Sequence, residues 1–135
     1  MRITADTNIL VRIVVRDDIA QAQAALSLLA RAEAVFITLP CLCEFVWVLN
    51  GTYRLPSDKV AQSVRAILER ANVYADAAVV TAGLQLMDAG GDFADGVIAA
   101  AGSAMGSEAF VSFDRQAVKR LTAAGIPARH ASEPA

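Results

Sequence analysis

Short apolar runs alternate with helical patterns along the whole chain of 135 residues. The runs at residues 2–5, 34–38 and 109–113 are rich in the β-branched, aromatic and aliphatic residues typical of buried strands. Strands that alternate with helices pair in parallel, because a helical crossover returns the chain to the same edge of the sheet. The pattern therefore predicts an α/β fold with a short parallel sheet covered by helices on both faces.

Capping residues indicate where the helices begin. Asp17-Asp18, Ser57, Asp76 and Asp92 are N-cap residue types, and Pro40 suits a first helical turn. We expect helices at residues 7–15, 18–32, 40–51, 57–70, 76–90, 92–105 and 115–124, with short strands at 72–75 and 126–130. No linker, repeat or low-complexity segment divides the chain, which predicts one domain over residues 1–131 and a loose tail at 132–135.

Four acidic residues occupy positions where an isolated carboxylate is unfavourable. Asp6 and Asp114 directly follow apolar runs, at strand ends where a parallel sheet binds ligands, and Glu44 is the only charged residue within 34–53. Burying a lone carboxylate costs several kcal/mol or more unless it is paired, neutralised or bound to a metal. Together with Asp95, these acids predict a site for a hard divalent cation such as Mg²⁺, which removes the repulsion between carboxylates.

Most of these acids also have a structural explanation. Asp6 and Asp114 each precede a helix and are candidate N-caps. Asp92 and Asp95 share one face of a first helical turn, where Asp92 is the natural N-cap and Asp95 could reach back as in a capping box. Glu44 lies a full turn inside its helix among apolar neighbours and has no capping role, so it is the most informative of the set.

The remaining reactive and aromatic side chains indicate no other chemistry. His130 is the only histidine, and we expect it to be solvated near the C terminus, which excludes a Ser-His-Asp or Cys-His mechanism. The spacing of Cys41 and Cys43 suits neither zinc nor a disulfide framework, so both are expected to be buried thiols. Trp47 and Tyr53 are expected to be core and rim aromatics rather than platforms for stacked bases.

Hydrophobic residues make up 56% of the chain, against about 45–50% in ordinary soluble domains. This excess predicts a surface for a partner or for self-association. The weakly charged stretch at 34–53 is interrupted by Pro40, Glu44 and Asn50, which favours a strand and a buried helix over a membrane span. The N terminus lacks the pattern of a signal peptide, so a cytoplasmic location is expected.

Four motifs of the chain resemble those of the PIN-domain family, and the closest likeness is to the VapC-type ribonuclease toxins of bacterial toxin–antitoxin pairs. The motifs are Asp6-Thr7-Asn8 after the first strand, Glu44 in an apolar helix, Asp92-Phe93-Ala94-Asp95 before an alanine-rich helix, and Ser112-Phe113-Asp114. The resemblance covers essentially the whole chain in order and spacing. The segment at 92–95 is its most specific part.

This resemblance carries expectations about the site and the assembly. Asp6, Glu44 and Asp95 match the core acids of the family, and Asp114 matches its more variable fourth acid. Thr7 or Asn8, together with Ser112, match positions that support the acids by hydrogen bonds, and the role of Asp92 stays open. The resemblance implies a three-layer α/β/α sandwich, RNA cleavage that depends on Mg²⁺ or Mn²⁺, homodimers, and inhibition by a small antitoxin protein.

The charge of the chain is compatible with a phosphate substrate. The net charge is −2, but without the four candidate ligands ten acidic residues face twelve Lys and Arg. Arg12, Arg16 and Arg115 are candidates for steering an RNA backbone, and each has the alternative of an ordinary solvated arginine.

Two other functions compete with a nuclease. A phosphoaspartyl-type phosphatase would need a second aspartate two residues after Asp6, where this chain has Asn8, and a nearby lysine, which the segments 7–53 and 71–114 lack. A non-catalytic PIN-like module would bind RNA or protein without cleaving it. Retention of four acids counts against such a module, because converging carboxylates repel a phosphate backbone.

Overall fold

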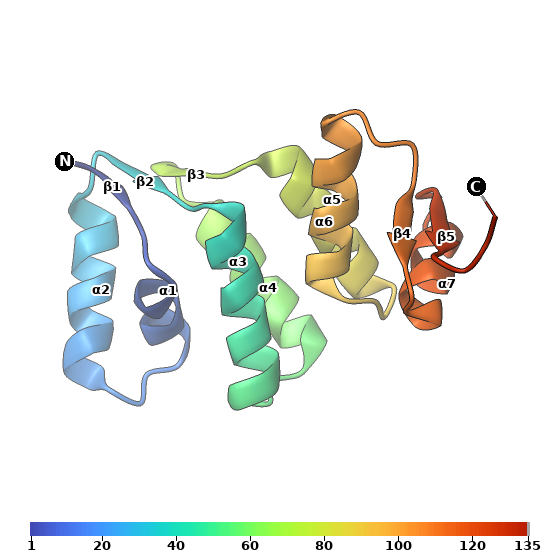
Figure 1. Ribbon diagram of the computed structural model, residues 1–135. Coiled ribbons are helices and arrows are strands. Elements are labelled where there is room, and N and C mark those ends of the chain that lie inside the picture. Colours follow the sequence, from blue (N-terminus) through green and yellow to red (C-terminus); the bar gives the residue numbers. More distant parts are fainter. Residues whose placement is uncertain (135) are drawn as a thin grey trace. The chain divides into compact units, whose positions relative to one another are not determined.

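A computed structural model describes residues 1–134 of the chain. In this range five short strands alternate with seven α-helices (Figure 1). The elements are β1 (Arg2–Thr4), α1 (Thr7–Val14), α2 (Ile19–Arg31), β2 (Ala34–Phe36), α3 (Leu39–Trp47), a π-helical turn η1 (Val48–Thr52), α4 (Ser57–Leu68), β3 (Val73–Tyr74), α5 (Ala77–Asp88), α6 (Phe93–Ala104), β4 (Phe110–Ser112), α7 (Arg115–Ala123) and β5 (Ala128–His130). All strand pairs are parallel. The mixed α/β class predicted from the sequence is confirmed, and short parallel strands between helices are consistent with a PIN-like α/β/α fold.

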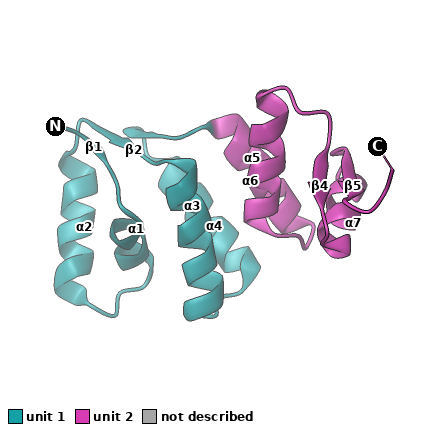
Figure 2. Ribbon diagram, viewed as in Figure 1, with its two compact units in different colours: residues 1–76 teal, residues 77–135 magenta. Residues whose placement is uncertain are grey.

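The chain divides into two compact units, unit 1 (Met1–Asp76) and unit 2 (Ala77–Ala135) (Figure 2). Unit 1 contains a three-stranded sheet in the order β1-β2-β3, and unit 2 contains the pair β4-β5. Nothing in the amino-acid composition marks this boundary. Residue 135, which belongs to the tail expected at 132–135, lies outside the described residues.

Unit 1 is a sheet whose connecting helices share one side. Its central strand β2 pairs with both neighbours, so that Val35 stands between Ile3 and Val73. Right-handed crossovers that move in one direction along a sheet place their helices on one face, and Figure 1 shows α1 to α4 on the same side of these strands. Phe45 and Leu42 of α3 are fully buried, which fixes the orientation of this helix.

Unit 2 is organised by close contact between α5 and α6. A Cβ atom added at Gly96 would lie 2.8 Å from the Cα atom of Gly83 and 3.0 Å from the carbonyl oxygen of Ala82. The two helix backbones therefore approach each other where neither has a side chain. Phe93, at the start of α6, is fully buried.

Several local expectations need correction. Ser57 is the first residue of α4 and not its N-cap, because the cap position belongs to Pro56, which offers no side-chain acceptor. Trp47 is 70% exposed instead of lying in the core, since the buried side of α3 is formed by other residues. Tyr53 is half-buried, in agreement with a rim position. Cys41 is buried, as expected, but Cys43 is only partly so.

None of the helices formed by the described residues is long and apolar enough to cross a membrane.

Candidate functional site

Unit 1 brings Asp6 and Glu44 to the same pocket, which has a volume of about 400 Å³. Asp6 is the N-cap of α1, and its Oδ1 atom accepts a hydrogen bond of 2.8 Å from the Thr7 N–H group. The buried Thr7 hydroxyl lies 3.8 Å from Sγ of Cys41, whose thiol donates to the Ala5 carbonyl at 3.6 Å. These contacts tie the start of α1 to α3, and this is how two acids 38 positions apart come to line one pocket.

The pKa of the Cys41 thiol is raised by its surroundings, which include both acids. Burial raises its pKa most, the Thr7 hydroxyl lowers it, and the charges of Asp6 and Glu44 raise it further. A thiol in this setting stays protonated, so Cys41 acts as a buried structural thiol and not as a nucleophile.

Unit 2 gathers three carboxylates around a second pocket of about 290 Å³, lined by Asp92, Asp95, Asp114 and Arg120. Asp92 is the N-cap of α6, and its Oδ2 atom accepts from the Asp95 N–H group at 3.1 Å. Burial raises the pKa of Asp95, and the charges of Asp92 and Asp114 raise it further. Arg120 does not neutralise the group through a described ion pair; its guanidinium donates to the Gly90 carbonyl.

Asp114 has the capping role that the sequence analysis left open. Its Oδ1 atom accepts from the N–H groups of Gln116 at 2.9 Å and Ala117 at 3.1 Å, which makes it the N-cap of α7. Its own N–H group donates to Oγ of Ser112 at 3.0 Å. Both capping bonds fall on Oδ1, so the cap does not use Oδ2.

The three residues expected to support the acids, Thr7, Asn8 and Ser112, differ in their contacts. Thr7 supports Asp6 through its backbone N–H group, while its hydroxyl faces Cys41. Asn8 is exposed and lines a different pocket, between α1 and α2. Ser112 holds the backbone of Asp114.

The four candidate acids were expected to be buried, and this expectation is wrong for three of them. Asp6, Glu44 and Asp114 are exposed, and Asp95 alone is half-buried with a desolvated carboxyl group. Asp6 and Asp114 lie where the chain passes from a strand into a helix and cap α1 and α7 at the surface, and Glu44 lies on the exposed side of α3. In the capping box considered for α6, Asp92 makes its bond, but residues 1–134 show no return bond from the Asp95 carboxylate.

Every candidate ligand is a carboxylate oxygen, which is the type of ligand that a hard divalent cation prefers. Asp6 and Glu44 in unit 1, and Asp92, Asp95 and Asp114 in unit 2, are the two groups that the structure defines. Among the described residues, no cluster of three or more His, Cys, Asp or Glu is close enough to hold a metal ion by itself. A metal would therefore need oxygen ligands beyond those that either group supplies in this geometry.

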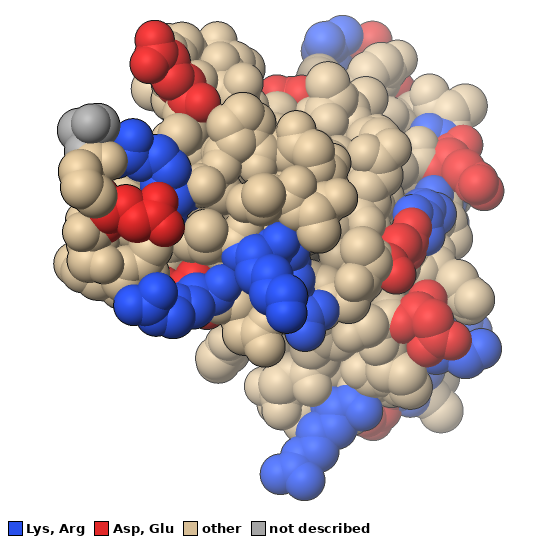
Figure 3. Space-filling view, turned by 90° about the vertical axis from the view of Figure 1, so that its right-hand side faces the viewer, with Lys and Arg blue, Asp and Glu red and all other residues tan. Residues whose placement is uncertain are grey.

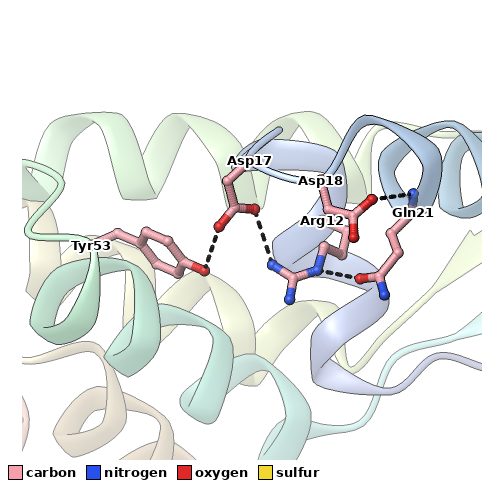
Figure 4. Close-up of polar contacts among 5 residues, drawn as sticks. All are labelled: Arg12, Asp17, Asp18, Gln21 and Tyr53. Atoms are coloured by element: carbon pink, nitrogen blue, oxygen red, sulfur yellow. Dashed lines mark hydrogen bonds and ion pairs between the residues drawn. The ribbon is translucent and has the colours of Figure 1, made fainter.

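The three candidate arginines differ in their surroundings. Arg12 donates from Nε to Gln21 at 2.6 Å and from a terminal nitrogen to Asp17 at 3.1 Å, and Tyr53 donates to the same Asp17 at 3.4 Å (Figure 4). Arg12 thus braces α1 against α2 and is a poor candidate for steering RNA. Arg16 and Arg115 are exposed. On the face shown in Figure 3, several Lys and Arg side chains lie side by side among wide uncharged areas.

His130 is the residue that the sequence analysis misjudged most. It is only 8% exposed, where a solvated side chain was expected. Its Nδ1 atom lies 2.6 Å from Oγ of Ser132, and its Nε2 atom lies 3.0 Å from the carbonyl oxygen of Phe113. The signal that could have revealed this was its place at the end of the expected strand 126–130, where it pairs in register with Ser112.

The chain matches the PIN domain family over residues 3–123. It belongs to this family. The match crosses the boundary between the two units, and it includes all four candidate acids. A comparison with curated proteins gave no match. PIN domains are generally nucleases, which is a hydrolase activity, and as nucleases they generally use divalent metal ions.

One prediction concerns the fifth acid of this PIN domain. Asp92→Ser is expected to leave nuclease activity nearly unchanged and the free energy of unfolding within about 0.5 kcal/mol of the parent, because serine replaces aspartate well as an N-cap. Activity assays and urea denaturation measure the two effects. A loss of activity as large as that of Asp95→Asn would place Asp92 among the metal ligands.

Proposed function

We propose that this PIN domain is an endoribonuclease that depends on Mg²⁺ or Mn²⁺ and acts as the VapC-type toxin of a toxin–antitoxin pair. The observation that carries the proposal is that Asp92, Asp95 and Asp114 line one pocket of unit 2, where burial first and then the charges of the other two acids raise the pKa of Asp95. Converging like charges are unfavourable unless a cation joins them. A protein that only binds RNA has no use for such a group beside the phosphate backbone.

Asp6, Glu44 and Asp95 are the proposed metal ligands, and Asp114 completes the set. A bound divalent ion lowers the pKa of a water molecule and relieves the charge of the phosphate. The protein orients its acids with backbone groups: Thr7 N–H holds one oxygen of Asp6, and Gln116 N–H and Ala117 N–H hold one oxygen of Asp114. In each aspartate the other oxygen is left for the ion. Thr7, Ser112 and Asp92 are thus supporting residues, and Asn8 keeps that role only as a proposal from its position in the motif.

Incubation of purified protein with single-stranded RNA, with Mg²⁺ or Mn²⁺ and with EDTA, tests the activity. We expect cleavage with either ion and none with EDTA. Binding of RNA without cleavage would favour the non-catalytic module. Release of phosphate from phosphomonoesters without RNA cleavage would favour the phosphoaspartyl-type phosphatase, which lacks support because Asn8 replaces its second aspartate.

The exposed apolar side chains of unit 1 support a homodimer and an antitoxin partner. Ile19 is 69% exposed and Trp47 is 70% exposed. A pocket of about 430 Å³ between α1 and α2 is lined by Ile9, Ala25 and Leu28 among others. Such a surface suits an amphipathic helix laid into a groove. An arginine from the same partner could pair with the acids in place of the metal.

Two experiments test the assembly and the toxin role. Light scattering at micromolar concentration should give the mass of a dimer, and a strict monomer would contradict that part of the proposal. Expression in a bacterial host should stop growth with the parent chain but not with Asp6→Asn, and co-expression of the adjacent upstream reading frame should restore growth. Equal growth in all three cultures would contradict the toxin role while leaving the nuclease activity open to the assay above.

The proposal also treats residues 1–131 as one cytoplasmic nuclease domain that acts as a whole. A family match that runs through both units supports the single domain. Removal of unit 2 is then expected to abolish cleavage, because Asp95 and Asp114 belong to it.

Glu44→Gln is expected to reduce cleavage by roughly 10²-fold or more, because it replaces an anionic ligand by a neutral one at the same size. Glu44→Ala should reduce activity equally. Since Glu44 is exposed, neither change should lower the free energy of unfolding by more than about 0.5 kcal/mol. RNA cleavage rates with urea denaturation check this, and parent-like rates in both variants would show that Glu44 is an ordinary surface residue.

A further inference from the structure

Among the described residues of unit 2, His130 is the one buried titratable side chain that the proposed reaction does not use. It ends β5, and only 8% of its surface is exposed. Both ring nitrogens have partners, namely Ser132 on the Nδ1 side and the Phe113 carbonyl on the Nε2 side. The ring also packs edge to face against Phe113, with centroids 5.9 Å apart and an angle of 83°.

One protonation form of the ring satisfies all of these contacts. The Ser132 N–H group donates to Nδ1 at 3.2 Å, so Nδ1 must offer a lone pair. The carbonyl oxygen of Phe113 lies 3.0 Å from Nε2 and can only accept a hydrogen bond, so Nε2 must carry a proton and donate it. The neutral Nε2–H tautomer is the form in which each partner is a correct donor or acceptor.

The contact to Phe113 bears directly on the turn that presents Asp114. Ser112 and His130 are paired in the parallel register of β4 and β5, and the Ala131 N–H group donates to the Ser112 carbonyl at 2.9 Å. The His130 ring then holds the next carbonyl, that of Phe113. The residue after Phe113 is Asp114, whose N–H group is held by Ser112. Hydrogen bonds therefore hold the backbone of Ser112, Phe113 and Asp114. The first two bonds come from residues 130 and 131, and the third comes from within the turn.

We propose that His130 is a positioning residue for Asp114: its neutral Nε2–H group holds the Phe113 carbonyl and thereby sets the direction in which the Asp114 carboxylate faces its ligand. This inference rests on the proposed metal-binding role of Asp114. Phe113 is 79% exposed, so packing alone does not fix the turn, and the hydrogen bond to its carbonyl supplies the restraint. Residues that orient a metal ligand typically contribute 10- to 100-fold in metal affinity.

The tautomer can be measured on the parent protein without metal. Nitrogen chemical shifts of the single histidine, recorded by two-dimensional NMR at about pH 8, where an ordinary histidine is neutral, report which ring nitrogen carries the proton. We expect the Nε2–H form. The Nδ1–H form, or rapid averaging of the two, would overturn the proposal, because the ring could not then hold Phe113.

Three variants test the link to Asp114. His130→Gln keeps a side-chain N–H group near the position of Nε2, His130→Ala removes it, and Ser132→Ala removes a partner of Nδ1 while leaving the Phe113 contact in place. In metal-free protein, amide exchange at Gln116 and Ala117 reports the capping bonds of Asp114. We expect faster exchange at these two amides in His130→Ala and near-parent exchange in His130→Gln and Ser132→Ala.

Calorimetric titration with Mg²⁺, below the unfolding transition of each variant, completes the test. The dissociation constant should rise about 10-fold or more in His130→Ala and stay within about 3-fold of the parent in His130→Gln and Ser132→Ala. Parent-like exchange and affinity in His130→Ala would overturn the proposal, as would equal losses in all three variants, which would indicate a general structural role. If the parent protein itself neither binds Mg²⁺ nor cleaves RNA, the proposed function fails, and the tautomer and exchange measurements still decide whether His130 positions Asp114.

Discussion

Asp95→Asn is expected to reduce the rate of RNA cleavage by roughly 10²-fold or more. It should also make the metal-free protein slightly more stable at neutral pH. The loss follows because the amide cannot supply the anionic oxygen that a divalent ion requires. The gain follows because the pKa of Asp95 is raised by burial and by the charges of Asp92 and Asp114. A carboxyl group with a raised pKa opposes folding when it is ionised.

The sign of this effect predicts its pH dependence. Above the folded-state pKa of Asp95 the ionised group destabilises the native protein, and as the pH falls through that value the destabilisation disappears. The stability advantage of Asp95→Asn should therefore be present at neutral pH and fade in acid, whereas saturating Mg²⁺ should reverse it by stabilising the parent. Urea denaturation across pH, with and without Mg²⁺, measures both trends.

Glu108→Gln is the matched control, since it removes an exposed acid of unit 2 that does not line the pocket. It should cleave RNA at the parent rate. Asp6→Asn, in unit 1, should lose activity as Asp95→Asn does. Full cleavage by either of the two aspartate variants in Mg²⁺ would remove that residue from the proposed ligand set.

Gly96→Ala is expected to destabilise the protein by about 1–3 kcal/mol and to impair cleavage, although alanine is the better helix former. The new Cβ atom would lie 2.8 Å from the Gly83 Cα atom and 3.0 Å from the Ala82 carbonyl oxygen, which are backbone atoms that cannot rotate away. The helices α5 and α6 must then separate. Asp95 precedes Gly96 in α6, so the carboxylate should move with the helix.

Gly102→Ala is the control for this change in the same helix. A Cβ atom there meets only the side chain of Ser107, with Oγ at 3.7 Å and Cβ at 3.9 Å. These are ordinary contact distances, so the gain in helix propensity should leave stability unchanged or raised by up to about 1 kcal/mol. Thermal and urea denaturation compare the two variants. Equal stability of Gly96→Ala and Gly102→Ala would show that the contact between the two helices adapts without cost.

Much of the fold follows from local signals in the sequence. Asp18, Thr38 and Asp92 each cap the helix that follows them by accepting a backbone N–H bond. Such bonds involve neighbours within a few positions, so the sequence alone contains both partners. The predicted strands also exist but are shorter, because strand ends depend on the partner strand.

The sequence predicts which residues form the candidate site but not their surroundings. The order and spacing of Asp6, Glu44, Asp95 and Asp114 resemble those of PIN-domain acids, and all four lie within the residues matched to the family, so their role stays a prediction. Their expected burial was wrong for three of the four. Exposure depends on which elements cover each side chain in the fold, and the pattern of a single segment does not contain that information.

The sequence by itself determined the alternation of strands and helices and most of the helix caps, because these depend on residues close to one another in the chain. Only the tertiary structure decided that Trp47 faces solvent, that Asp95 shares a pocket with Asp92 and Asp114, and that His130 is buried against Phe113. Those outcomes depend on which elements, distant in sequence, pack against each residue. The place of His130 at the end of an expected strand is a local sign of burial, but the partner of that strand is decided only in the fold, where β5 pairs with β4.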